Sequence, residues 1–258
     1  MTEAVTHAEW LAQKERESRV KQEAFLKGIS SRLGRQRSMT PPPHPFKGAP
    51  DFWNVMDYDV EHRMTAFVDQ FSAAGGHAVR FPDMEAAAVF IAERAIQLKA
   101  RRLVRQDQPE LAALDLEKRL AEHASVTAWN TDSGTAWKTA AAEADIGIVL
   151  ADYAVAHTGS VVALSAAHKG RSVSLLPAAL FVLLPAQRIR TRLGEVLAEF
   201  DRSGRAGLPA GIHFISGPSR SSDIENDLTI GVHGPGLVYA LLVDAFVPAD
   251  RMREGGGR

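Results

Sequence analysis

The residues whose types and spacing best suit chemistry lie in the segment 217–235. A Gly-Pro-Ser-Arg turn there carries the hydroxyl of Ser219 and the guanidinium of Arg220. A His-Gly-Pro turn follows it, with His233 and Gly234. Backbone N–H groups, a hydroxyl and a guanidinium favour binding of an anion such as a carboxylate or a phosphate.

Acidic residues separate the two turns, and they have two interpretations. In the first, Asp223 orients His233, which then acts as a general acid or base on a bound ligand. In the second, Ser222 and Glu225 form the capping box S-x-x-E of a short helix, and Asp223 favours the positive end of that helix. His233 then bonds only to its own turn.

A second candidate is the turn Thr158-Gly159-Ser160, which lies between two short apolar segments. A glycine between two hydroxyl residues is typical of a tight turn, so a plain hairpin connection is one interpretation. The other is a small cradle of hydroxyl and N–H groups for an anion or a carbonyl oxygen. We expect this turn to meet Arg220 and His233 at the carboxyl edge of a sheet, where ligands of open α/β sheets bind.

Composition limits the function classes. The 258 residues contain no cysteine, which excludes a disulfide framework, a thiolate nucleophile and a cysteine-ligated iron–sulfur cluster in this chain. The formal net charge of −1 gives no support to a nucleic-acid partner. No metal-ligand spacing and no nucleotide-binding motif occur, so we expect no metal and no cofactor. No apolar run reaches the ~20 residues that span a bilayer, and we expect a cytoplasmic protein without membrane insertion.

The chain divides into three parts by composition. Residues 1–45 contain a charged stretch, Ala8–Leu33, with one thin apolar stripe at helical spacing, and then a proline-rich linker. We expect a helical arm, packed loosely on the body or docked on a partner chain. Residues 46–250 form the body, and the glycine-rich residues 251–258 form a flexible tail.

Helical and strand-like segments alternate in the first half of the body. Ile146–Ala151 is apolar throughout, as in a parallel strand that is covered on both faces. Short strands then follow too closely for crossover helices, so we expect hairpins. This order predicts a three-layer α/β sandwich with a mixed sheet. The short strands are expected at Ala154–His157, Val161–Ser165, Val173–Leu176 and Phe181–Leu184.

The Gly-Pro-Ser-Arg and His-Gly-Pro turns together resemble the signature of the LUD-domain (lactate utilisation) family, and the resemblance covers roughly residues 50–247. It implies the α/β fold shared by glucosamine-phosphate isomerases, ribose-phosphate isomerases and coenzyme A transferases. The family's turn usually reads Ala-Glu-Thr-Gly-Thr. Here His157 stands where the family usually has Glu, and Ser160 stands where it usually has Thr. A mechanism that needs that glutamate therefore has no support in this chain.

The resemblance further implies a part in the oxidation of L-lactate to pyruvate, beside iron–sulfur subunits that hold the clusters. We consider two hypotheses of function. The chain is a non-redox subunit that binds lactate, pyruvate or a related small carboxylate. Alternatively, it is a free-standing enzyme of the isomerase/coenzyme A transferase-like fold that acts on a phosphosugar or an acyl thioester. The missing cysteines and cofactor motifs favour the first.

Overall fold

The computed structural model describes residues 6–38, 40, 56–130, 134–222 and 228–247. Contacts within the chain separate two units, Met1–Trp53 and Asn54–Arg258. In the first unit, helix α1 (His7–Arg32) begins at Thr6, whose hydroxyl accepts the N–H of Glu9 while the Glu9 carboxylate accepts the N–H of Thr6. This capping box fixes the helix start. The predicted helical arm is confirmed, and no residue of α1 is buried.

A chain shortened to residues 46–258 should still unfold in one cooperative thermal transition. The reason is that α1 buries no side chain, whereas the second unit has its own hydrophobic clusters. Circular dichroism during heating measures this transition for the shortened and the full chain. A broad, non-cooperative loss of signal in the shortened chain would contradict the expected domain boundary.

Six parallel strands form the central sheet, in the order β1-β12-β7-β4-β2-β3. Every residue of β4 and β7 is buried, as expected for parallel strands covered on both faces. The strands are β1 (His77–Asp83), β2 (Arg102–Arg105), β3 (Ser125–Ala128), β4 (Ile146–Leu150), β7 (Ala179–Pro185) and β12 (Leu237–Ala245).

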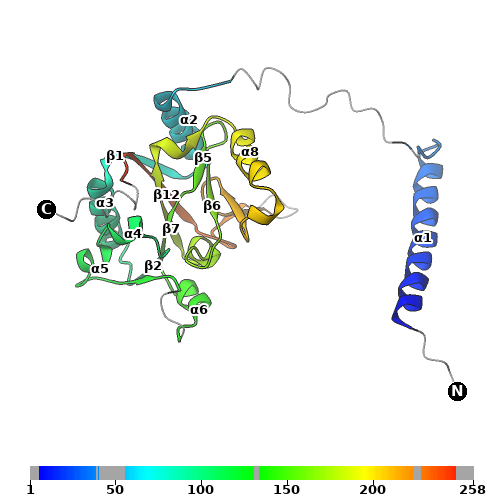
Figure 1. The fold of residues 1–258 in the computed structure, drawn as a ribbon, viewed down its shortest axis with the longest axis horizontal. Coiled ribbons are helices and arrows are strands. Elements are labelled where there is room, and N and C mark those ends of the chain that lie inside the picture. Colours follow the sequence, from blue (N-terminus) through cyan, green and yellow to red (C-terminus); the bar gives the residue numbers. More distant parts are fainter. Residues whose placement is uncertain (1–5, 39, 41–55, 131–133, 223–227, 248–258) are drawn as a thin grey trace. The chain divides into compact units, whose positions relative to one another are not determined.

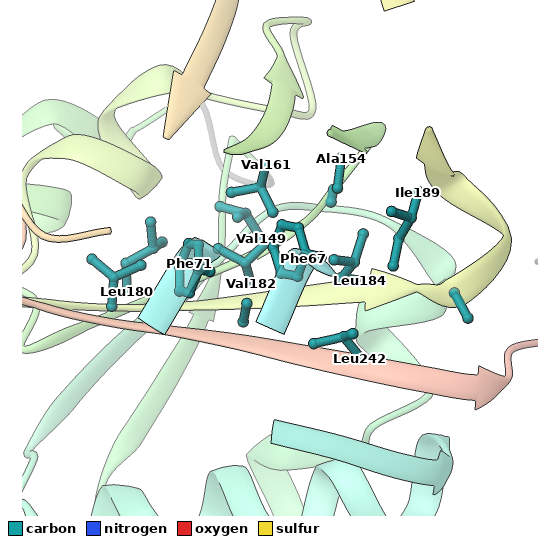
Figure 2. Close-up of a cluster of buried hydrophobic side chains, with 14 of the residues drawn as sticks. Phe67, Phe71, Val149, Ala154, Val161, Leu180, Val182, Leu184, Ile189 and Leu242 are labelled. Carbon is teal, nitrogen blue, oxygen red and sulfur yellow. The ribbon is translucent and has the colours of Figure 1, made fainter. Parts of the chain in front are cut away.

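One face of the central sheet is covered by helix α2 (Val60–Ala73), whose start is capped by Asp59. Phe67 and Phe71 of α2 are fully buried, and their rings stack at a centroid distance of 5.3 Å. Figure 2 shows both rings beside Val182 of β7 in one apolar cluster. This packing holds the end of α2 firmly over the sheet.

Helix α3 (Met84–Gln97) covers the opposite face. Successive residues of a strand point to opposite sides of the sheet, so alternate residues of β7 face α3. Phe181 and Leu183 of β7 therefore join a second cluster with Ile91 of α3. Figure 1 shows α3, α4 and α5 on one side of the central sheet, and β5, β6 and α8 on the other. The short helices on the α3 side are α4 (Pro109–Ala112) and α5 (Leu116–Arg119).

A second sheet of four strands has the order β8-β5-β6-β9. Its β5–β6 and β6–β9 pairs are antiparallel, and its β5–β8 pair is parallel. The α/β fold is thus confirmed, with the parallel and mixed pairings divided between two sheets. These strands are β5 (Tyr153–Val155), β6 (Ser160–Leu164), β8 (Ile189–Arg190) and β9 (Ile212–Ile215).

Two sequence expectations about local structure need correction. Val173–Leu176 is not a strand, since α7 (Arg171–Leu175) occupies this stretch and buries Val173 in the cluster of α2. Phe181–Leu184 belongs to the central parallel sheet and not to the hairpins. Tertiary packing decides both cases, because short apolar runs fit a helix and a strand alike.

The residues on either side of the expected capping box form a small hairpin. Ser222 ends strand β10 (Arg220–Ser222), which pairs antiparallel with β11 (Leu228–Ile230). Asp223 and Glu225 lie outside the described residues. The capping-box expectation falls on this segment and therefore stays a prediction. The remaining elements are α6 (Trp137–Ala142), α8 (Leu193–Ser203), η2 (Ala186–Arg188) and η3 (Arg205–Gly207).

Candidate functional site

The two turns singled out in the sequence lie at the amino-terminal edge of the central sheet. The His-Gly-Pro turn leads directly into β12, and the N–H of Gly236 donates to the carbonyl of Ala178, just before β7. Our expectation of the carboxyl edge is therefore wrong for these turns. The strand before His233 is β11, which belongs to the small hairpin, so His233 stands at the entry to a central strand.

Backbone hydrogen bonds join the two turns directly. The N–H of Ser219 donates to the carbonyl of Pro235, and the N–H of Gly231 donates to the carbonyl of Ser219, both at 2.9 Å. A Cβ on Gly234 would lie 3.2 Å from the Cβ of Ser219. The structure thus brings the two turns into contact at Ser219 and Gly234.

Arg220 reaches the C-terminal end of α2. Its Nη2 donates to the carbonyl oxygen of Ala74, the C-cap residue of that helix. The last carbonyls of a helix lack partners within the helix and form the negative end of its dipole, so a cation is stabilising there. A guanidinium has five N–H donors, and the Arg220 side chain is exposed, so this contact leaves donors for a ligand.

The Thr158-Gly159-Ser160 turn connects β5 to β6 and lies against the same helix end. Gly159 has φ of +58°, and a Cβ there would lie 2.4 Å from the backbone N of Phe71. The Thr158 and Ser160 hydroxyls are 2.8 Å apart. The turn is therefore a hairpin connection, as one interpretation held, and it also holds the hydroxyl of the exposed Thr158 in contact with that of the buried Ser160.

A hydroxyl chain links this turn to the Gly-Pro-Ser-Arg turn. Ser160 Oγ lies 2.7 Å from Ser216 Oγ, and Ser216 directly precedes Gly217. A Cβ on Gly217 would lie 2.8 Å from the carbonyl oxygen of Ala74. Sequence reasoning missed Ser216 and Ala74, although the position of Ser216 beside the turn was a usable signal.

Two turns that carry hydrogen-bond donors, the Thr158-Gly159-Ser160 turn and the Gly-Pro-Ser-Arg turn, thus meet at the C-terminal end of α2, and we call this group the α2-end cluster. Its members are Thr158, Ser160, Ser216, Ser219 and Arg220, and the exposed His233 stands on the adjoining turn. Hydroxyls and a guanidinium suit the oxygens of a small carboxylate. Asp223, the expected partner of His233, lies outside the described residues. Within the described ranges, no group of three or more His, Asp or Glu side chains has the geometry to hold a metal ion.

A family model described as the LUD domain matches residues 64–243, which include every turn of the α2-end cluster. The chain belongs to the LUD domain family. The lactate utilization protein C of Halalkalibacterium halodurans is 32% identical to this chain over 223 residues, covering 83% of this chain and 94% of that protein. The uncharacterized protein YkgG of Escherichia coli is 34% identical over 136 residues, covering 52% and 59%.

A solved structure shares the fold of this LUD domain. It is a crystal structure of a DUF162 family protein from Deinococcus radiodurans, with a TM-score of 0.55 and 20% sequence identity. The match covers 72% of this chain and 99% of that one. The same α/β arrangement therefore recurs at low sequence identity. Among the described helices of this chain, none combines the length and the apolar character that crossing a membrane requires.

The carboxyl edge of the LUD domain's central sheet carries other polar groups, which sequence reasoning did not single out. Asp152, just after β4, forms an ion pair with the buried Lys169. Arg105, at the end of β2, donates from Nε to Glu117 at 2.7 Å. Each of these charges has a partner within the domain, which favours a structural role for both pairs.

Replacing Gly159 by Ala should strongly destabilise the LUD domain, by about 2–4 kcal/mol, because a clash with a helix backbone adds to the cost of a left-handed conformation. Gly194 of α8 has nothing within 4 Å of an added Cβ. Gly194→Ala should therefore be neutral or stabilise by up to about 1 kcal/mol. Urea unfolding of both variants measures the difference. Equal stabilities would show that the turn is not held against α2.

Proposed function

We propose that this chain serves lactate utilisation in the cytoplasm, as a non-redox component that binds lactate, pyruvate or a related small carboxylate. Membership of the LUD domain family and the names of relatives that cover most of the chain support the pathway. The absence of cysteine from the 258 residues supports the non-redox part, because such a chain cannot ligate an iron–sulfur cluster through thiolates.

The observation that carries the ligand proposal is the α2-end cluster. Arg220 would hold the carboxylate in a two-pronged contact, and Ser219 and the Thr158–Ser160 turn would supply smaller donors. His233 would donate to the neighbouring hydroxyl or carbonyl oxygen, or take a proton from it. The contact of Arg220 with Ala74 supports this arrangement, because it fixes the guanidinium at the helix end against which the Thr158–Ser160 turn also packs.

The partners in this proposal are iron–sulfur subunits of a lactate-oxidising complex. The oxidation of lactate to pyruvate releases two electrons and two protons, so a subunit without redox groups needs partners that accept the electrons. The clusters of those subunits would do so. This chain's residues would bind and orient the substrate and move a proton at its hydroxyl oxygen.

Two measurements test the proposal. Deletion of the gene in the source organism should abolish growth on L-lactate and leave growth on glucose unchanged. The purified chain alone should show no visible absorbance and should not reduce an electron-accepting dye with L-lactate. Unchanged growth on L-lactate would contradict the pathway, and steady dye reduction by the isolated, metal-free chain would contradict the non-redox role.

A further inference from the structure

A serine and a histidine lie in hydrogen-bond contact at the far end of the second sheet. Ser165 follows the last residue of β6, and His213 lies in β9, the neighbouring antiparallel strand. Ser165 Oγ and His213 Nε2 are 2.8 Å apart. Both side chains are half-buried, so neither is sealed from solvent. This is the distance at which an imidazole accepts the proton of a nucleophilic hydroxyl.

Gly211 leaves the space in which the two side chains meet. A Cβ at this position would lie 2.8 Å from His213 Nε2 and 3.2 Å from Ser165 Oγ. The carbonyl of Gly211 also accepts the N–H of Ser165 at 2.9 Å. Any larger residue would therefore push the imidazole away from the hydroxyl, so the contact depends on this glycine.

The surroundings keep the imidazole in the form that accepts a proton. Burial lowers the pKa of His213, and the positive charge of Arg171 lowers it further. In the tautomer that carries its proton on Nδ1, the neutral imidazole accepts the hydrogen bond of the Ser165 hydroxyl at Nε2. Arg171, at the start of α7, is exposed and supplies a positive charge near the pair.

The segment between Ser165 and Arg171 is fixed to the domain. A β-bridge joins Ala166 to Lys169, and the Lys169 ammonium is paired with Asp152. Groups that do chemistry need such support to stay in position. The pair is also distinct from the α2-end cluster, because Ser160 and Ser165 stand at opposite ends of β6, about 16 Å apart at the usual rise of a strand.

We propose that Ser165 and His213 form a nucleophile–base pair that cleaves a small ester or thioester, with Arg171 favouring an acyl group that carries a negative charge. This activity is separate from the proposed role in lactate utilisation and does not depend on it. A hydrogen bond that merely ties β6 to β9 is the competing interpretation, and it predicts no reactivity at Ser165.

The reaction balances with water as the only co-reactant. Ser165 Oγ forms a bond to the acyl carbon and gives its proton to His213 Nε2. The bond from the acyl carbon to the oxygen or sulfur leaving group breaks, and His213 returns the proton to that group. Water then attacks the acyl-serine with His213 as base, which releases the acid and restores the hydroxyl.

A fluorophosphonate probe, which modifies activated serine hydroxyls covalently, tests this proposal on the full chain. We expect one labelled site, identified as Ser165 by mass spectrometry of the digested protein. His213→Gln keeps a side chain that can bond to Ser165 but removes the base, so labelling should fall about 10²-fold. The control Ser203→Ala removes an exposed serine of α8 and should leave labelling unchanged.

Hydrolysis of two small esters tests the proposed substrate class. The chain should hydrolyse the p-nitrophenyl monoester of succinic acid faster than p-nitrophenyl acetate, and Arg171→Met should remove that preference. Thermal unfolding confirms that each variant is folded. Absence of labelling in the folded wild-type chain, labelling at another serine, or equal labelling of the His213→Gln variant would each overturn the proposal.

Discussion

Replacing Asp152 by Asn should lower the free energy of unfolding by about 3–5 kcal/mol, the largest stability effect that we expect from one polar residue. The Asp152 carboxylate is 17% exposed and its partner Lys169 is 9% exposed, so neither charge is well solvated. The other carboxylate oxygen accepts the N–H of Leu164 at 2.8 Å. The asparagine variant leaves a buried ammonium without a counter-charge.

The matched control for Asp152→Asn is Glu143→Gln. Glu143 pairs with Arg102 on the surface, where the two side chains are 56% and 58% exposed. Water and salt screen such a pair, so its loss should cost less than about 1 kcal/mol. Urea unfolding measures both variants. Similar losses in the two variants would contradict the view that the Lys169 pair is a buried anchor.

Replacing Arg220 by Lys should abolish lactate-dependent growth while changing stability by less than about 1 kcal/mol. The contact with Ala74 needs one donor and a positive charge, and lysine keeps both. A two-pronged contact with a carboxylate needs the planar fork of arginine, which lysine lacks. The same substitution therefore separates the capping role of Arg220 from its proposed role in binding.

The test expresses the Arg220→Lys variant in a strain that lacks the gene, and compares growth on L-lactate with thermal unfolding of the purified protein. Arg190→Lys is the control, because the Arg190 guanidinium also donates to a backbone carbonyl, that of Gln187, and lies over the Tyr153 ring, which is not a member of the α2-end cluster. It should support normal growth. Normal growth with the Arg220→Lys variant, or a large loss of stability in that variant, would contradict a binding role for Arg220 that is separate from capping.

The sequence was sufficient for the features that depend on local pattern. The apolar run Ile146–Ala151 predicted the buried β4, and the charged stretch Ala8–Leu33 predicted α1. The Thr158-Gly159-Ser160 turn was correctly placed between two short strands. In each case the hydrophobic period or a turn residue carries the information, and neighbours along the chain decide the structure.

Features that depend on distant contacts could not be predicted. Arg220 and its acceptor Ala74 are 146 residues apart, and Ser160 and Ser216 are 56 residues apart. No local pattern marks such pairs. The prediction that the two turns lie at the carboxyl edge of the sheet was wrong for a related reason. Whether a strand such as β11 joins the central sheet depends on its partners, and these decide which edge a turn occupies.

The most direct measurement of the central claim is calorimetric titration of the full-length protein with L-lactate and with pyruvate, for the wild-type chain and for Arg220→Lys. We expect saturable binding of at least one of the two by the wild-type chain. We also expect binding at least about tenfold weaker for the variant, since a charge-assisted contact contributes about 1.5–3 kcal/mol. Binding of neither carboxylate by the wild-type chain, or equal binding by both proteins, would contradict the central claim.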